Sequence, residues 1–219
     1  MTVGYFFCFV GPVAAGKSFL SRRLLERHGE ELLLAISATS RDPRPKEVDG
    51  EHYFFLTRQQ FMERVDSGEF FEWEETHGHL YGTPQQWIRR VTEENRHVLL
   101  DVDVRGAMTF FHKFPSQFKG ILVLPPSIST LIERVKLRGG VSDEELLRRL
   151  ETMKRELIDF EEAIDEGGFQ FWISNKDRDK SEQEVEAIFQ GQESQKNTDM
   201  VQARLELKRL TEEIWEYEL

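Results

Sequence analysis

The sequence predicts an α/β protein of three layers, in which helices cover both faces of a mainly parallel β-sheet. This prediction depends on two observations. Short apolar runs of strand length alternate with segments that have helical spacing, and such alternation is typical of parallel strands joined by crossover helices. The motif GPVAAGKS at residues 11–18 also follows one apolar run and precedes a helical pattern, which is the setting of a phosphate-binding loop.

The first elements lie on either side of this loop. Residues 5–10, YFFCFV, form a near-continuous apolar strand, and SFLSRRLLERH after the loop places Phe19, Leu20 and Leu24 on one side of a helix. Further buried strands are expected at LLLAIS, HVLLDV, GILVL and FQFWIS. Cys8 is the single cysteine of the sequence, so it cannot form an internal disulfide, and we expect a buried spacer.

The pattern changes between residues 37 and 83, which predicts an inserted lobe. The runs YFFL and EFFEWEE indicate short strands, some of them antiparallel, on either side of a helix at TRQQFMERVDSG. Thr57 and Gln60 have the spacing of a capping box at the start of that helix, and Gly68 suits its end.

The core of the protein is then expected at residues 1–36 and 84–190, with a lid at about 134–150. Ser142 and Glu145 have the spacing of a second capping box, which opens a long charged helix. The sequence RGG precedes this helix, and its glycines are expected to act as a hinge for the lid.

The C-terminal part changes character twice. The polar stretch QGQESQKNTD predicts a linker at 191–199, and a helix is expected at 200–219. Apolar residues of this helix recur at spacings of three and four: Met200, Ala203, Leu207, Leu210, Ile214 and Tyr217. The seam is short for a free coiled coil, so we favour packing on the chain's own domain over a homodimer contact.

The composition favours an enzyme or binding domain of the cytoplasm. The formal net charge of −11 argues against binding to a nucleic-acid polymer, which requires many Lys and Arg contacts to phosphate. No run approaches the roughly 18 apolar residues of a membrane-spanning helix, so no membrane partner is expected. The N-terminus lacks a basic segment followed by a long apolar one, and no signal peptide is expected.

The loop carries the chemistry of a phosphate cradle. Its defining glycines, lysine and serine match the pattern G-x-x-x-x-G-K-[ST], in which backbone N–H groups converge on phosphate oxygens, the lysine reaches the β- and γ-phosphates, and the serine holds Mg²⁺. Alanine disfavours positive φ, so a cost in strain is expected at Ala14, in the middle of the loop. The residues expected to form this phosphate cradle are Gly11, Pro12, Val13, Ala14, Ala15, Gly16, Lys17, Ser18 and Phe19.

A second anion site is predicted in SATSRDPRPKEVDGEHY, residues 37–53. Arg41 and Arg44 are three residues apart in a loop that two prolines keep extended, and Tyr53 follows. Guanidinium groups bind phosphate oxygens through paired hydrogen bonds, so these groups together would hold a second phosphate. Asp101 ends the strand at LLDVDVRG, where it is placed like the carboxylate that orders Mg²⁺ in nucleotide-binding sheets.

Taken in order, these motifs resemble the guanylate kinase family over about residues 5–190. The resemblance is carried by the phosphate loop, ISATSRDPRPKEVDGEHYFF, GEFFEWEETHGHLYGT, LLDVDVRG, LPPS, and VKLRGG followed by RRL. It implies a P-loop NTPase fold with an inserted GMP-binding lobe and a helical lid. It also implies an ATP- and Mg²⁺-dependent kinase that converts GMP to GDP in purine nucleotide metabolism.

The resemblance further implies roles for individual residues. The groups that would bind the GMP phosphate are Arg41, Arg44, Tyr53 and Tyr81, and the guanine readers would be Ser37, Glu72, Thr83 and Asp103. Asn175 resembles the adenine-side contact of the family. The residues expected to stabilise charge in catalysis are Lys17, Arg41 and the lid arginines Arg134, Arg138 and Arg149. Arg105 departs from the family, in which glutamine is usual at this position.

The guanine assignment also makes physical sense. Guanine presents N1–H and an exocyclic NH₂ as donors, which the carboxylates of Glu72 and Asp103 can accept, whereas adenine has a lone pair at N1. A site whose buried polar groups pair only with the right ligand rejects the wrong one by on the order of 10⁴.

Two other protein classes share part of these motifs. A P-loop GTPase would explain D-x-x-G at 103–106, but its N-K-x-D motif fails in NKDRD because Arg178 stands at the required aspartate. Nucleotide hydrolysis without GMP would favour that class. A noncatalytic guanylate-kinase-like scaffold typically lacks the loop lysine and the lid arginines, and this sequence has both.

Overall fold

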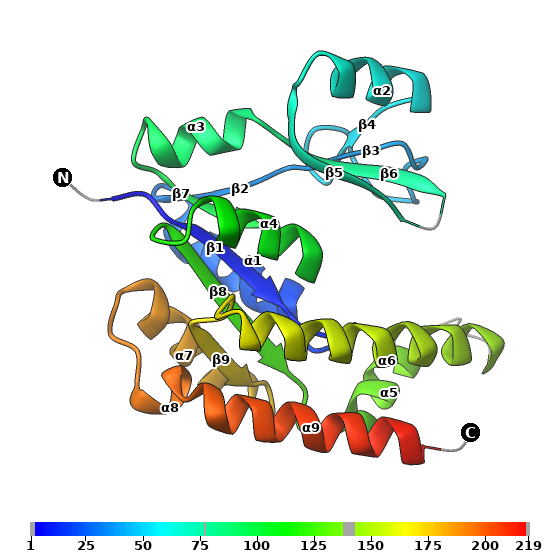
Figure 1. The fold of residues 1–219 in the computed structure, drawn as a ribbon, viewed down its shortest axis with the longest axis vertical. Coiled ribbons are helices and arrows are strands. Elements are labelled where there is room, and N and C mark those ends of the chain that lie inside the picture. The colour runs from blue at the N-terminus through cyan, green and yellow to red at the C-terminus, as the bar shows by residue number, and fades with distance from the viewer. Residues whose placement is uncertain (1–2, 77, 138–142, 218–219) are drawn as a thin grey trace.

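The computed structural model describes residues 3–76, 78–137 and 143–217. Within these residues, five parallel strands form a central sheet in the order β2-β7-β1-β8-β9. Helices lie on both faces of this sheet (Figure 1), which confirms the predicted three-layer α/β class. The strands are β1 (Phe6–Val10), β2 (Leu32–Leu34), β7 (His97–Leu100), β8 (Phe118–Leu124) and β9 (Phe171–Ser174).

The side chains of β1 alternate between two layers of the hydrophobic core. Phe7 and Phe9 contact the layer covered by α1 (Lys17–His28) and α7 (Arg178–Phe189). The even-numbered residues contact the layer covered by α3 (Gln86–Thr92), α4 (Val104–Lys113), α5 (Ile128–Leu137), α6 (Asp143–Asp165) and α9 (Met200–Glu216). Cys8 is fully buried in this second layer, as predicted, and burial raises the pKa of its thiol. None of the helices in the described residues is both long and apolar enough to span a membrane.

A second, smaller sheet lies above one end of the first (Figure 1). Its strand order is β4-β3-β6-β5, with β6 antiparallel to both of its neighbours, and its own small core includes Phe61, Phe70 and Leu80. The elements are β3 (Ala38–Thr39), β4 (Phe54–Phe55), α2 (Arg58–Asp66), β5 (Phe70–Thr76) and β6 (His79–Pro84). These elements occupy the part of the chain where the sequence predicts an inserted lobe.

Helix α2 begins and ends where the sequence indicates. Thr57 accepts a hydrogen bond from the backbone N–H of Gln60, and the Gln60 side chain accepts one from the backbone N–H of Thr57, which is the predicted capping box. Gly68 has φ 70° and donates its N–H to the Val65 carbonyl just beyond the helix. This left-handed turn directs the chain into β5, the strand that carries Glu72.

Several loops of the chain lie at the edge of the main sheet where its parallel strands end. The carboxyl ends of parallel strands meet at one edge, and ligands gather where neighbouring connections leave in opposite directions. Strand β1 lies between β7 and β8, so this point comes directly after β1, where the phosphate loop follows. Asp101 comes directly after β7, and Asn175 comes directly after β9, at the same edge.

The C-terminal helix α9 packs on its own chain. Ala203, Leu207, Leu210 and Ile214 are all buried in the core layer that also contains α6, and the two helices lie side by side (Figure 1). An ion pair between Arg204 and Asp165 joins one end of this contact. The apolar seam is therefore covered within the chain, as the favoured interpretation expected, and it does not offer a free face for a homodimer.

The segment 191–199, where the sequence predicts a linker, contains regular structure and packs on the sheet. A short helix, α8 (Gln195–Thr198), lies there and contacts β9. Asn197 is buried and donates its side-chain N–H to the Trp172 carbonyl, while the indole of Trp172 donates to the Lys196 carbonyl at 2.8 Å. The polar composition of this segment reflects hydrogen bonding to the end of the sheet rather than a free connection.

Shortening a side chain in the apolar seam of α9 should destabilise the folded chain, because that seam is buried against α6. Leu207→Ala should lower the free energy of unfolding by about 2–5 kcal/mol, because it leaves a cavity beside α6. Denaturant unfolding measures this change, and size-exclusion chromatography should show an unchanged oligomeric state. Val201→Ala is the matched control, since Val201 is exposed on the same helix. Altered oligomerisation with unchanged stability would contradict the intramolecular packing.

Candidate active site

The phosphate loop requires glycine at both of its ends. Gly11 has φ 153° and Gly16 has φ 108°, in the region that L side chains rarely adopt. A Cβ atom on Gly11 would lie 2.1 Å from the Val123 carbonyl oxygen, and one on Gly16 would lie 2.0 Å from Asn175 Nδ2. The loop thus passes directly against β8 and the end of β9, where only glycine fits.

Ala14 adopts the left-handed conformation that the sequence analysis associated with strain. Its φ is 61°, and its side chain is buried. This conformation costs a non-glycine residue roughly 1–2 kcal/mol, which the surrounding packing has to offset. The loop therefore holds an alanine at a position where glycine would be free of strain.

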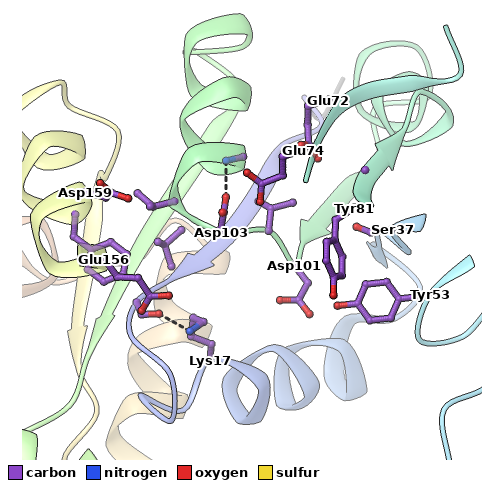
Figure 2. Close-up of a pocket in the computed structure, with 17 residues that line it drawn as sticks. Lys17, Ser37, Tyr53, Glu72, Glu74, Tyr81, Asp101, Asp103, Glu156 and Asp159 are labelled. Atoms are coloured by element: carbon purple, nitrogen blue, oxygen red, sulfur yellow. Dashed lines mark hydrogen bonds between the residues drawn. The ribbon is translucent and has the colours of Figure 1, made fainter. Parts of the chain in front are cut away.

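Lys17 extends along the loop from the first turn of α1. Its Nζ donates to the Gly11 carbonyl at 2.5 Å and to the Pro12 carbonyl at 3.1 Å. These contacts keep the ammonium group over the loop, where it lines a cleft (Figure 2). Ser18 is exposed at the following position of α1.

Two residues predicted to contact a nucleotide, Asn175 and Arg134, form hydrogen bonds with the backbone of the phosphate loop. The Asn175 side chain is 2% exposed, and its Nδ2 donates to the Ala15 carbonyl at 2.7 Å. Arg134 donates to the Asn175 carbonyl at 2.9 Å and also contacts the Ala15 carbonyl at 3.3 Å. Within the described residues, Asn175 Oδ1 is buried and has no hydrogen-bond partner. Both side chains thus fix the backbone of the phosphate loop.

A cleft of about 360 Å³ lies between the loop and the small sheet (Figure 2). Its lining comes from β1 and the loop, from the small sheet, from the segment after β7 and from α6. The predicted site residues that line it are Gly11, Lys17, Ser37, Tyr53, Glu72, Tyr81, Asp101 and Asp103. The fold therefore brings both halves of the predicted site to one cavity.

Glu72 is the buried carboxylate of the small sheet. Its Oε1 accepts a hydrogen bond from Thr83 Oγ1 at 2.5 Å, across the antiparallel pair of β5 and β6. Burial raises the pKa of Glu72, the bond from Thr83 partly opposes that increase, and the nearby Asp103 adds to it. Thr83 is fully buried, so it reaches the cleft through Glu72 rather than as part of the lining.

Asp103 has a structural role besides its place in the cleft. Its Oδ1 accepts the backbone N–H of Gly106 at 2.8 Å, which caps the N-terminus of α4. The cap fixes the carboxylate at the point where the chain leaves β7 and turns into the helix. Asp103 therefore faces the cleft in a defined orientation (Figure 2).

Two phenols lie opposite the phosphate loop. The rings of Tyr53 and Tyr81 are 6.1 Å apart in an edge-to-face arrangement, and both hydroxyl groups point toward the side of the cleft that holds Asp101 (Figure 2). Burial raises the pKa of Tyr53, and the negative charge of Asp101 adds to the increase. Tyr53 therefore stays protonated at neutral pH, and the hydroxyl groups of both phenols can donate hydrogen bonds to an anion.

The two arginines of the predicted second anion site differ in position. Arg41 lies behind the phenols, with its guanidinium 5.4 Å from the centre of the Tyr53 ring, and it forms a two-fold ion pair with Glu47. Arg44 is exposed at the surface of the same loop. Neither guanidinium lines the cleft itself.

The remaining predicted residues lie outside the cleft lining. Arg149 is on α6, where its Nε donates to Glu145 at 2.9 Å. The Phe19 ring lies under the guanidinium of Arg178, 5.3 Å from ring centre to Cζ. Arg138 and Ser142 fall outside the described residues, as do the glycines expected to form the hinge.

Comparison with known proteins identifies the family. A family model described as guanylate kinase matches residues 6–192. The chain belongs to the guanylate kinase family. Curated guanylate kinases of Rhodococcus jostii and Thermotoga maritima are 42% identical over 187 residues and 35% identical over 208 residues, respectively. The first match covers 84% of this chain and 86% of the relative, and the second covers 94% and 97%.

A solved guanylate kinase has the same fold. The crystal structure of the enzyme from Anaplasma phagocytophilum matches this chain with a TM-score of 0.66 at 22% identity, and the match covers 96% of this chain and 97% of that one. The P-loop kinase architecture inferred from the sequence is therefore confirmed at the level of the fold.

The cleft lining also includes residues that the sequence did not indicate as site residues, among them Glu74, Glu156, Asp159 and Phe160. Glu156, Asp159 and Phe160 come from α6, and the carboxylate of Glu156 lies beside Lys17 (Figure 2). Burial raises the pKa of Glu156, and the positive charge of Lys17 partly opposes that increase. Glu156 follows Arg149 by seven residues and Phe160 follows Glu156 by four, which places the three on one face of a helix, and this signal could have found them.

Proposed function

We infer that this chain transfers the γ-phosphoryl group of ATP to GMP, giving ADP and GDP. The observation that carries the inference is the single cleft that has the phosphate-loop lysine on one side and the phenols and buried Glu72 on the other. Family membership supports the same reaction. Transfer between two nucleotides bound in one cleft is direct and in line, so the acceptor oxygen attacks the γ-phosphorus while ADP leaves.

On the acceptor side, guanine is read by carboxylates. Glu72 accepts one guanine donor, and the hydrogen bond from Thr83 keeps the Glu72 carboxylate turned into the cleft. Asp103 accepts another, with Ser37 beside them. The base edge of adenine lacks the N1–H donor, so an adenine here would leave a buried carboxylate without a partner.

The acceptor phosphate is held by phenols and arginines. Tyr53 and Tyr81 donate from the cleft lining, Arg41 adds charge from behind them, and Arg44 reaches in from the surface loop. Charge-assisted hydrogen bonds of this kind are shorter and stronger than neutral ones. They align the oxygen that receives the phosphoryl group.

The donor side is built on the phosphate loop. Backbone N–H groups and the N-terminus of α1 hold the ATP phosphates, and Lys17 leaves its loop carbonyls to meet the β- and γ-phosphates. The unpaired Oδ1 of Asn175 is an acceptor suited to the adenine amino group. Lid closure brings the lid arginines Arg134, Arg138 and Arg149 to the transferring group and excludes water.

The donor set also fits Mg²⁺. Ser18 and Asp101 present oxygen atoms near the loop, and oxygen ligands shared with substrate phosphates are what Mg²⁺ prefers. Among the described residues that line the cleft, Lys17 is the one basic side chain beside six carboxylates, so a bound cation would offset their repulsion of the phosphates. When bound with ATP, Mg²⁺ neutralises charge on the phosphate oxygens.

A substrate panel tests this function. ADP formation from ATP should be fast with GMP and slower by on the order of 10⁴ in kcat/KM with AMP, because of the carboxylate pairing. UMP and CMP should also be poor acceptors. Equal rates with GMP and AMP would contradict base reading, and ADP formation without any acceptor would indicate a hydrolase instead.

A further inference from the structure

Arg41 is fixed by a carboxylate that neither the motifs nor the proposed roles include. Glu47 Oε2 accepts Nη1–H of Arg41 at 2.8 Å, and its Oε1 accepts Nη2–H at 3.0 Å. The pair is largely removed from solvent, with side-chain exposures of 12% for Arg41 and 17% for Glu47. Planar two-fold pairing of this kind fixes the orientation of a guanidinium as well as its position.

The same carboxylate closes the loop on itself. Glu47 Oε2 also accepts the backbone N–H of Arg44 at 2.6 Å, and Arg41 Nη1 donates to the Asp42 carbonyl at 2.7 Å. The Arg41 guanidinium lies over the rings of Tyr53 and Phe55, 5.4 and 5.6 Å from their centres. These contacts leave the arginine little freedom to change rotamer.

Neither Glu47 nor the Asp42 carbonyl uses one edge of the guanidinium. They take both N–H donors of Nη1 and one of Nη2, which leaves the edge formed by Nε–H and the second N–H of Nη2. Hydrogen bonding to Glu47 raises the pKa of Arg41, and a hydrogen bond with Tyr81 adds a smaller increase, so Arg41 also contacts the cleft phenol beside which the phosphate would bind. That edge can bind two oxygens of one phosphate.

We propose that Glu47 is a positioning residue, which holds Arg41 so that the remaining edge of its guanidinium meets the phosphate of GMP. The inference rests on the proposed function, because it takes the GMP phosphate to bind beside Tyr53 and Tyr81. Arginine has many rotamers, so an arginine fixed in advance loses less entropy when the phosphate arrives.

The ion pair persists at every practical assay pH. Hydrogen bonds from the Arg41 guanidinium and the Arg44 backbone lower the pKa of Glu47 to about 2. Neutral-pH measurements therefore sample a charged carboxylate throughout. In the opposite role, Glu47 would occupy the place of the phosphate and compete with it. Removal of its charge would then tighten GMP binding, whereas a positioning role predicts weaker binding.

Binding of GMP and of guanosine separates these roles. Calorimetry with Glu47→Gln should show GMP bound about 10-fold or more weakly and guanosine bound as in the wild type, because only the phosphate contact depends on Arg41. Glu47→Asp, which keeps the charge, should recover part of the loss. Glu75→Gln is the matched control, since Glu75 forms a similar two-fold pair with Arg58 on the exposed side of the same lobe. This control should bind both ligands normally.

Several results would overturn the proposal. Unchanged or tighter GMP binding by Glu47→Gln would do so, and so would an equal loss for guanosine, which indicates damage to the lobe. Thermal unfolding of each variant checks that the lobe is folded. If Arg41→Met abolishes the preference for GMP over guanosine while Glu47→Gln keeps it, the inference fails and the proposed function stands. If the wild type binds GMP no more tightly than guanosine, both fail.

Discussion

Lys17→Ala should lower kcat by about 10³-fold or more, because a positioned cation that meets the transferring phosphoryl group supplies much of the catalysis in phosphoryl transfer. The lysine lies on the donor side of the cleft and already rests on the loop carbonyls of Gly11 and Pro12. GMP binding should stay within about two-fold of the wild type, since the acceptor groups belong to the other wall. Steady-state kinetics with separate GMP titration measures both effects.

Lys113→Ala is a suitable control for this experiment. Lys113 is exposed at the end of α4 and does not line the cleft. Its removal changes the net charge by the same amount, so it corrects for long-range electrostatics. A Lys17→Ala enzyme with normal kcat would contradict the role of the loop as the donor cradle.

Glu72→Gln should raise the KM for GMP and lower kcat/KM by about 10²-fold, because a hydrogen bond to a charged acceptor contributes roughly 1.5–3 kcal/mol and the neutral amide cannot replace that acceptor. The KM for ATP should change little, since Glu72 lies on the acceptor wall. Initial rates at varied GMP and at varied ATP give the two constants. Glu75→Gln, on the opposite face of β5, should behave as the wild type.

The raised pKa of Glu72 adds a pH signature to this prediction. As the pH falls toward that pKa, the carboxyl takes up a proton and stops accepting the guanine N1–H. The KM for GMP should therefore rise on acidification in the wild type and should depend less on pH in Glu72→Gln. Equal effects of the substitution on the GMP and ATP constants would indicate a distorted lobe instead.

The main sheet could be predicted because its signals are local. The apolar run of β1 is buried on both faces, the glycine-rich loop follows it, and Leu20 and Leu24 mark the buried side of α1. The capping box of Thr57 was equally clear, since the hydrogen bonds involved span only three residues. The packing of the segment at 191–199 could not be predicted, because its partner Trp172 is distant in sequence and a backbone carbonyl has no sequence signal.

The cleft residues divide in the same way. Lys17, Glu72 and Asp103 belong to short motifs, so their places could be inferred from the resemblance. The supporting contacts could not be inferred, because they join separate elements. Asn175 donates to the Ala15 carbonyl, and Glu156 interacts electrostatically with Lys17. Glu47 lies inside a recognised block, yet its pairing with Arg41 depends on how the loop folds.

The central claim is that two phosphate-binding walls face one cleft, and a linked dinucleotide tests it most directly. Adenosine and guanosine joined 5′ to 5′ through a chain of phosphates should bind at least about 10²-fold more tightly than GMP or ATP alone, because the second contact becomes intramolecular. Isothermal titration calorimetry measures this affinity, and both nucleotides should compete with the linked compound. Binding no tighter than that of the better single nucleotide, or displacement by only one of them, would contradict the account.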